Sequence, residues 1–222
     1  MTTAEAWSTA WRHREWRRTL ASGLVLAALL TRATQAFFHV IEARAGTAPF
    51  DPLLHLVGPR DVAVATFVTL YGSILMGLAL VLADPARTAR LTHAYGMLLA
   101  LRLLTMYIVP LEPPAGIIPL EDPITALFYP DRQPFLKDLF FSGHTATLTL
   151  LALAVGPGLG RRVLAAAAIG VGALLLVQHV HYTIDTVVAP LFAWLAWWLS
   201  AWPVRLCGAS TDEWRAAERR EL

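Results

Sequence analysis

Long apolar stretches alternate with shorter polar ones along the chain of 222 residues. Six of the apolar stretches have the length of about 20 residues that a helix needs to cross a hydrocarbon core. They cover roughly residues 19–41, 62–83, 91–110, 139–157, 163–180 and 183–202. The pattern therefore predicts an all-α protein, a polytopic membrane helical bundle whose six transmembrane helices form one membrane domain over residues 1–222.

The composition agrees with a bilayer environment. The chain is 56% hydrophobic and only 15% charged, and its mean hydropathy is +0.53, well above the balance of a soluble domain. The net charge of +2 is too small to favour a nucleic-acid partner. A single cysteine, Cys207, excludes an intramolecular disulfide.

The distribution of basic residues predicts the orientation. With the N-terminus in the cytoplasm, cytoplasmic segments hold twelve of the eighteen Lys and Arg residues, the opposite side holds four, and Arg32 and Arg102 lie within spans. Residues 1–18 and 204–222 are then cytoplasmic tails, and residues 111–138 form an extracytoplasmic loop. Seventeen arginines against one lysine favour a bacterial source, so we expect an integral multi-pass protein of a bacterial inner membrane.

Two polar motifs interrupt the apolar pattern, Asp138-Leu-Phe-Phe-Ser-Gly-His-Thr145 and His181-Tyr-Thr-Ile-Asp185. The predicted topology places both on the extracytoplasmic side, at the ends of spans. Ionisable residues close to a hydrocarbon core are costly and by default mark a functional site. Taken alone, the first motif could be an ordinary helix start and the second a satisfied polar pair. The occurrence of both motifs on the same side of the membrane favours a catalytic function.

The spacing of the second motif predicts a catalytic pair. His181 and Asp185 are four residues apart, so on a helix the carboxylate can accept a proton from one imidazole nitrogen and leave the other as a nucleophile toward phosphorus. The His144 side chain is suited to protonate a leaving alkoxide and then to deprotonate an acceptor. We therefore predict His144, His181 and Asp185 as the catalytic residues.

Three further residues are candidates for substrate binding. Ser142 and Gly143 come where a helix starts, and backbone N–H groups at such an end favour an anion. Arg102 lies at a depth from which its side chain can reach a phosphate, and Arg32 fits this role and simple snorkelling equally well. His13, His39, His55 and His93 lack such partners in the sequence.

These motifs resemble those of the sphingomyelin synthase family, a branch of the type 2 phosphatidic acid phosphatase superfamily. The resemblance runs from about Leu101 to Ala189 and rests on three stretches: Arg102-Leu-Leu-Thr-Met-Tyr107, Asp138 to Thr145, and His179 to Asp185. It implies a six-span fold, His181 as the nucleophile with Asp185 as its partner, and His144 as the acid and base. Lys137 and Val180 depart from the family pattern, and residues 52–60 match its early motif only loosely.

The resemblance implies transfer of a phospho-headgroup, phosphocholine or phosphoethanolamine, from a phospholipid donor to a lipid alcohol acceptor such as ceramide. Phosphatases of the wider superfamily carry a Lys-x6-Arg-Pro motif and a Ser-Arg pair before the nucleophile, where this chain has Leu174 and Leu175. A less cationic pocket suits a phosphodiester better than a dianionic monoester. A lipid phosphatase or phospholipase C-type hydrolase and a non-enzymatic lipid carrier or scramblase remain the alternatives, and no metal or cofactor is expected.

Overall fold

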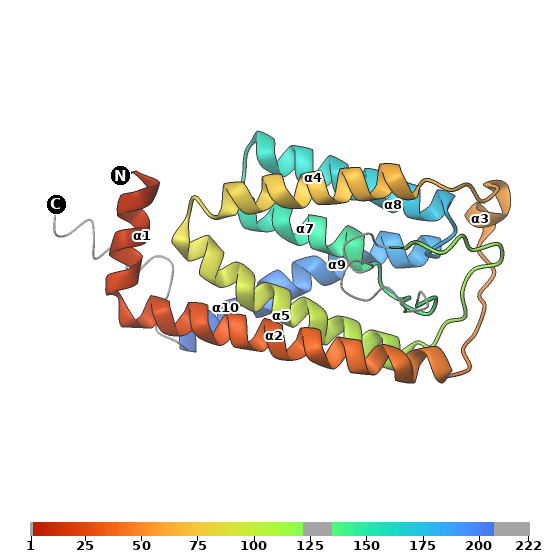
Figure 1. The fold of residues 1–222 in the computed structure, drawn as a ribbon, viewed down its shortest axis with the longest axis horizontal. Coiled ribbons are helices and arrows are strands. Elements are labelled where there is room, and N and C mark those ends of the chain that lie inside the picture. The colour runs from red at the N-terminus through yellow and green to blue at the C-terminus, as the bar shows by residue number, and fades with distance from the viewer. Residues whose placement is uncertain (1, 122–134, 207–222) are drawn as a thin grey trace.

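The structure is a computed structural model that describes residues 2–121 and 135–206. This part of the chain is all-α and contains the helices α1 (Thr3–Arg12), α2 (Arg14–Ala43), α3 (Pro52–Leu56), α4 (Ala63–Val81), α5 (Pro85–Ile108), α7 (Gly143–Val155), α8 (Leu159–Val177), α9 (Thr183–Leu199) and α10 (Ala201–Leu206). The long helices run side by side as a bundle (Figure 1). The predicted fold class is confirmed. The predicted loop 111–138 and the tail 204–222 lie partly outside the described residues.

The number of full-length spans differs from the prediction. Within the described residues, five helices are long and apolar enough to cross a membrane: α2, α4, α5, α8, and α9 continued by α10. The stretch predicted at 139–157 forms only the 13 residues of α7, about 20 Å at 1.5 Å per residue, against a hydrocarbon core of about 30 Å. Ser142 caps the start of α7, and Gly156, at φ 77°, ends it. Six spans are therefore not confirmed.

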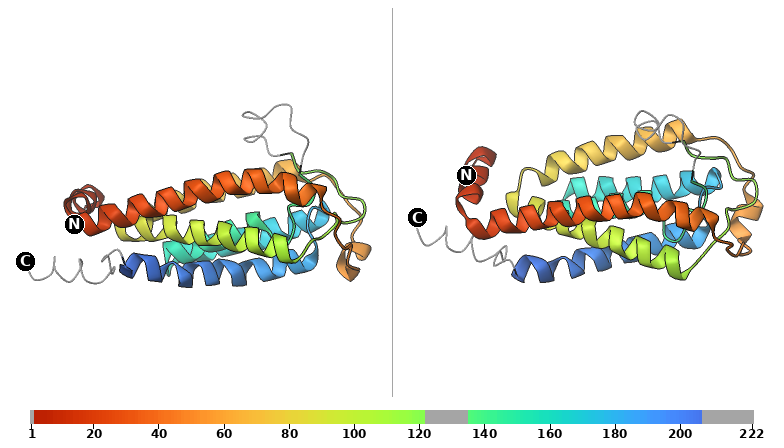
Figure 2. Two further views of the ribbon diagram at one scale, coloured as in Figure 1. Left: turned by 90° about the horizontal axis from the view of Figure 1, so that it is seen from below. Right: turned by 60° about the horizontal axis from the view of Figure 1, so that its bottom comes forward.

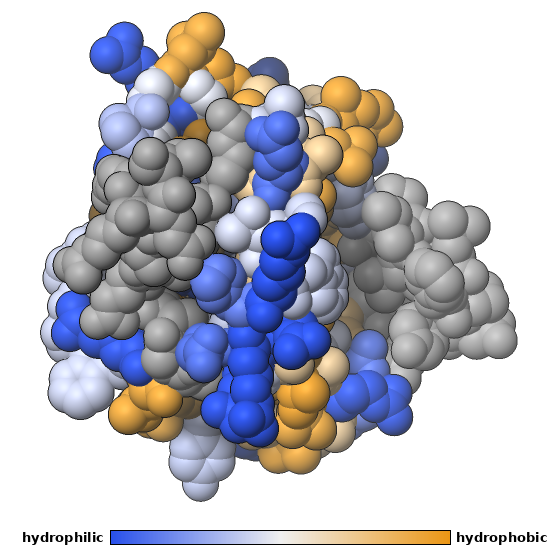
Figure 3. All heavy atoms as spheres, turned by 90° about the vertical axis from the view of Figure 1, so that its left-hand side faces the viewer, coloured by the Kyte–Doolittle hydropathy of each residue, from blue (hydrophilic) through white to orange (hydrophobic). Residues whose placement is uncertain are grey.

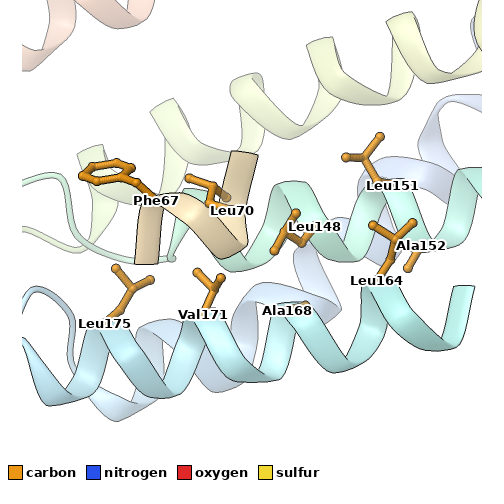
Figure 4. Close-up of a cluster of buried hydrophobic side chains, with 9 residues drawn as sticks. All are labelled: Phe67, Leu70, Leu148, Leu151, Ala152, Leu164, Ala168, Val171 and Leu175. Carbon is orange, nitrogen blue, oxygen red and sulfur yellow. The ribbon is translucent and has the colours of Figure 1, made fainter. Parts of the chain in front are cut away.

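The short helix α7 lies at the centre of the bundle. On one side Leu148, Leu151 and Ala152 of α7 pack against α4 and α8 (Figure 4). On the other side Ala146 and Leu150 pack against α5 and α9. Because neighbouring helices cover α7, its length need not match the membrane.

The two ends of the bundle differ. The starts of α4, α7 and α9 and the ends of α2, α5 and α8 meet at one end, beside α3, whereas α1 crosses the other end (Figures 1 and 2). Two tryptophans hold α1 and the start of α2 against the connection between α4 and α5. The indole N–H of Trp7 donates to the carbonyl of Leu82 at 2.8 Å, and that of Trp16 donates to the carbonyl of Pro85 at 2.9 Å. Seen from the α1 side, a hydrophilic band runs between hydrophobic side chains (Figure 3). Both polar motifs lie at the α3 end.

Candidate active site

The His181–Asp185 pair forms at the start of α9. His181 Nδ1 lies 3.3 Å from Asp185 Oδ2, and both side chains are buried. The same Oδ2 accepts the backbone N–H of Tyr182 at 3.1 Å, as in a capping box. The sequence predicted this contact from a shared helix face. His181 lies before the helix, however, and the cap and first turn of α9 bring it to Asp185. With an ionised carboxylate and a neutral imidazole, this contact places the proton on Nδ1 and leaves the lone pair on Nε2.

Ser142 joins the two motifs. Its backbone N–H donates to the carbonyl of Asp185 at 3.0 Å, and its hydroxyl accepts the N–H of Thr145 at 3.4 Å as the N-cap of α7. The side chain is fully buried. Since Ser142 uses these groups inside the protein, it fixes α7 against α9, and phosphate binding by Ser142 and Gly143 stays a prediction.

His144 is the second residue of α7 and is half-buried. The Ser142–Asp185 contact brings the start of α7 to the start of α9, so His144 and His181 belong to the same end of the bundle. Its predicted role as acid and base rests on this placement.

Arg102 reaches from α5 into the first motif. Its guanidinium donates to the carbonyl of Phe141 and to the carboxylate of Asp138, and it is almost completely buried. Gly143 makes room for it, since a Cβ on that residue would lie 2.8 Å from Arg102 Cζ. Arg102 therefore holds the segment that leads into α7. Arg32, in contrast, is exposed on α2, where Nη1 donates to Gln35 at 3.4 Å.

Two residues to which the sequence analysis assigned no role connect the surrounding loops. Asp51 caps α3 and accepts the backbone N–H of Thr183 at 2.6 Å. His179 has a left-handed backbone with φ 57°, and its Nδ1 and Nε2 lie 3.0 and 2.6 Å from the carbonyls of Ala115 and Val57. The pair Asp51-Pro52 is a recognisable helix start, but contacts between residues 64 to 132 positions apart leave no sequence signal.

A polar network surrounds the entry to α7. Lys137 Nζ donates to Glu112 Oε1 at 2.9 Å and to the carbonyl of Arg44 at 2.6 Å, and the hydrogen bond from Lys137 holds the pKa of Glu112 below its ordinary value. Tyr182 donates its hydroxyl to the carbonyl of Glu112 at 3.0 Å, and burial raises the pKa of this phenol. Lys137, a departure from the family pattern, thus ties the segment before α7 to the end of α2 and to the segment that follows α5, and Tyr182 adds the connection before α9.

The described residues contain no group of three or more His, Cys, Asp or Glu side chains that could hold a metal ion. The candidate site is consequently a histidine–carboxylate pair, a second histidine at a helix start and one buried arginine paired with a carboxylate.

A comparison with family models matches part of the chain. Residues 137–202 match the family model described as PAP2 superfamily C-terminal. The matched segment contains His144, His181 and Asp185, and it supports the type 2 phosphatidic acid phosphatase superfamily, whose members are phosphatases or phosphotransferases. No curated protein and no solved structure matches the chain.

Proposed function

We propose that the protein is a membrane enzyme that transfers a phospho-headgroup from a glycerophospholipid to ceramide or another lipid alcohol, as the sphingomyelin synthase family does. The headgroup is phosphocholine or phosphoethanolamine. The observation that carries the proposal is the buried contact of 3.3 Å between His181 Nδ1 and Asp185 Oδ2, fixed beside the start of α7. It prepares an imidazole nitrogen for attack on phosphorus.

In the first step His181 Nε2 attacks the phosphorus of the donor lipid. An N–P bond forms as the P–O bond to diacylglycerol breaks, and His144 gives its proton to the leaving alkoxide. Asp185 stabilises the positive charge that develops on the His181 ring. The product is a phosphohistidine that still carries the headgroup.

In the second step the lipid alcohol takes the headgroup. His144, now neutral, accepts the hydroxyl proton while the acceptor oxygen attacks phosphorus. The N–P bond breaks, and its electron pair returns to Nε2. Both histidines regain their starting protonation states, so the cycle closes with no metal or redox step.

The charges around the site support a phosphodiester substrate. Two described cations lie by the segment before α7, and each is already paired with a carboxylate: Arg102 with Asp138, and Lys137 with Glu112. A phosphate monoester carries two negative charges, and moving it out of water is costly unless cationic side chains that are not already paired with carboxylates contact it. A diester carries one negative charge and fits this near-neutral site better.

The direct test is to follow labelled headgroups. Detergent-purified protein is incubated with phosphatidylcholine or phosphatidylethanolamine labelled in the headgroup, with and without ceramide. We expect the label in a new lipid only when the acceptor is present. Label released into water would instead make the protein a phospholipase C-type hydrolase.

Two controls separate the remaining alternatives. Phosphatidic acid tests the charge argument, which fails if this monoester is cleaved much faster than either diester. The variant His181→Ala tests catalysis, with the exposed His55→Ala as its matched control. Unchanged lipid movement in His181→Ala would favour a non-enzymatic carrier or scramblase.

The same proposal includes the location. We infer that the protein resides in a bacterial inner membrane with the α3 end, and hence the site, on the extracytoplasmic side. The excess of arginines in the predicted cytoplasmic segments supports this orientation.

A further inference from the structure

Asp51 lies in the connection between α2 and α4 and caps the short helix α3. Its Oδ1 accepts the backbone N–H groups of Leu53 and Leu54 at 3.0 and 3.3 Å, and Pro52 occupies the first turn. These contacts are those of an ordinary N-cap. They explain why α3 starts here but not why the carboxylate is buried.

The same carboxylate also holds the first residue of α9. Oδ2 accepts the Thr183 backbone N–H at 2.6 Å, and Oδ1 accepts the Thr183 hydroxyl at 2.9 Å. Thr183 is separated from Asp51 by 132 positions and stands midway between His181 and Asp185. One side chain therefore connects α3 to the turn that forms the catalytic pair.

Hydrogen bonds occupy both carboxylate oxygens of Asp51. Asp51 is only 9% exposed, and four N–H or O–H groups converge on its two oxygens. No salt bridge to it occurs within the described part of the chain. Within the described residues, neutral N–H and O–H groups stabilise this buried carboxylate. Because hydrogen bonds depend on direction as well as on distance, the two bonds from Thr183 fix the position of Thr183 relative to Asp51.

We infer that Asp51 is a positioning residue for the proposed headgroup transfer, an inference that rests on that function. By holding Thr183, Asp51 fixes the turn in which His181 Nδ1 meets Asp185, and thereby the direction in which Nε2 points. A displacement of about 1 Å of a reacting group costs on the order of 100-fold in rate. A purely structural cap of α3 would affect folding only.

The test replaces the carboxylate by its nearest neutral analogue. Asp51→Asn keeps the shape and one acceptor oxygen but places an amide N–H₂ where the other oxygen accepts from Thr183. We expect kcat to fall roughly 10- to 100-fold with KM changed less than about threefold. Thr183→Val should lower kcat in the same direction, and Thr183→Ser, which restores the hydroxyl, should return it close to the original value.

Asp61→Asn is the matched control. Asp61 is an exposed aspartate in the next loop whose Oδ1 accepts the N–H of Ala63 at 3.0 Å, the same type of contact without the link to α9. We expect its kcat to be unchanged. A fall in kcat that follows the unfolded fraction of each variant, or equal effects of Asp51→Asn and Asp61→Asn, would overturn the inference.

A second measurement does not depend on the proposed activity. Diethyl pyrocarbonate modifies accessible imidazoles, and peptide mass spectrometry gives the rate for His181 relative to the exposed His55. We expect a several-fold higher relative rate for His181 in Asp51→Asn than in the unmodified sequence or in Asp61→Asn. If the protein transfers no headgroup but the relative rate still rises, the proposed function fails and positioning by Asp51 holds. If the protein transfers the headgroup, but neither Asp51→Asn nor Thr183→Val changes kcat or the relative modification rate of His181, the positioning role of Asp51 is overturned and the proposed function stands.

Discussion

Gly143 determines how close α5 approaches the start of α7. A Cβ at this residue would lie 2.8 Å from both Cζ and Nη1 of Arg102, a distance that real contacts essentially never show. Arg102 in turn donates to Phe141 and Asp138 in the segment before the helix. The absence of a side chain at Gly143 thus allows a buried arginine to support the candidate site.

We therefore expect Gly143→Ala to displace Arg102 and to destabilise the protein by about 1–3 kcal/mol, as overpacking does. Thermal unfolding in detergent measures this effect. The matched control is Gly72→Ala in α4, where a Cβ meets nothing within 4 Å and alanine improves helix propensity. Equal melting points for the two variants would contradict the proposed packing of Arg102.

The charge of Asp51 makes a prediction about pH. Burial opposes ionisation, but hydrogen bonds from Thr183, Leu54 and Leu53 hold the pKa of this carboxyl below its ordinary value of 3.8. A lowered folded pKa stabilises the protein above the unfolded value, and this stabilisation is lost as the pH falls through the folded value. The melting-point difference between the original protein and Asp51→Asn should be constant from pH 6 to 5 and should narrow below about pH 4. A constant difference down to pH 3 would argue that the pKa of Asp51 is the same in the folded and unfolded protein, so that the hydrogen bonds do not lower it.

At the level of residues, the sequence predicted contacts that are local and missed those that are distant. The spacing of His181 and Asp185 indicated their contact, although the cap and first turn of α9 bring them together and not a shared helix face. Two other contacts depend on how the connections around α3 and α9 pack: Asp51 with Thr183, and His179 with Val57. The pairing of Arg102 with Asp138 likewise depends on how α5 approaches α7.

At the level of elements, α7 shows why hydropathy alone overestimated the number of spans. Hydropathy counts the apolar residues Leu139, Phe140 and Phe141 toward a span, but these residues belong to the loop before the helix. Phe141 is buried there and stacks on Phe192 of α9 at 4.3 Å between ring centroids. An apolar residue in a buried loop and one in a transmembrane helix look the same to a sequence average.

The central position of α7 predicts where the fold is most sensitive. Leu148 is fully buried between α4 and α8, so Leu148→Ala should leave a cavity and cost about 2–5 kcal/mol. Leu75→Ala in α4 is the control because that side chain is 69% exposed, and its cost should be below about 1 kcal/mol. Denaturation midpoints in detergent compare the two. A larger loss in Leu75→Ala would place the main packing of the bundle elsewhere.

At the level of the whole molecule, the two ends of the bundle are expected to face different compartments. The site lies at the α3 end, and α1 lies at the other end (Figure 1). Leu56 in α3 is 83% exposed and Ser8 in α1 is exposed, so each is suitable for a reporter cysteine once Cys207 is replaced by serine. A membrane-impermeant maleimide added to intact cells should label Leu56→Cys directly and Ser8→Cys only after permeabilisation. The reverse labelling pattern would place the site in the cytoplasm.

The central claim is that His181 carries the headgroup during transfer. Purified protein is mixed with phosphatidylcholine labelled in the headgroup, quenched within one turnover in alkali, which preserves N–P bonds, and digested for peptide mass spectrometry. We expect label on His181, its loss on a chase with ceramide, and no label in His181→Ala. Active transfer without label on His181, or with label on another residue, would contradict it.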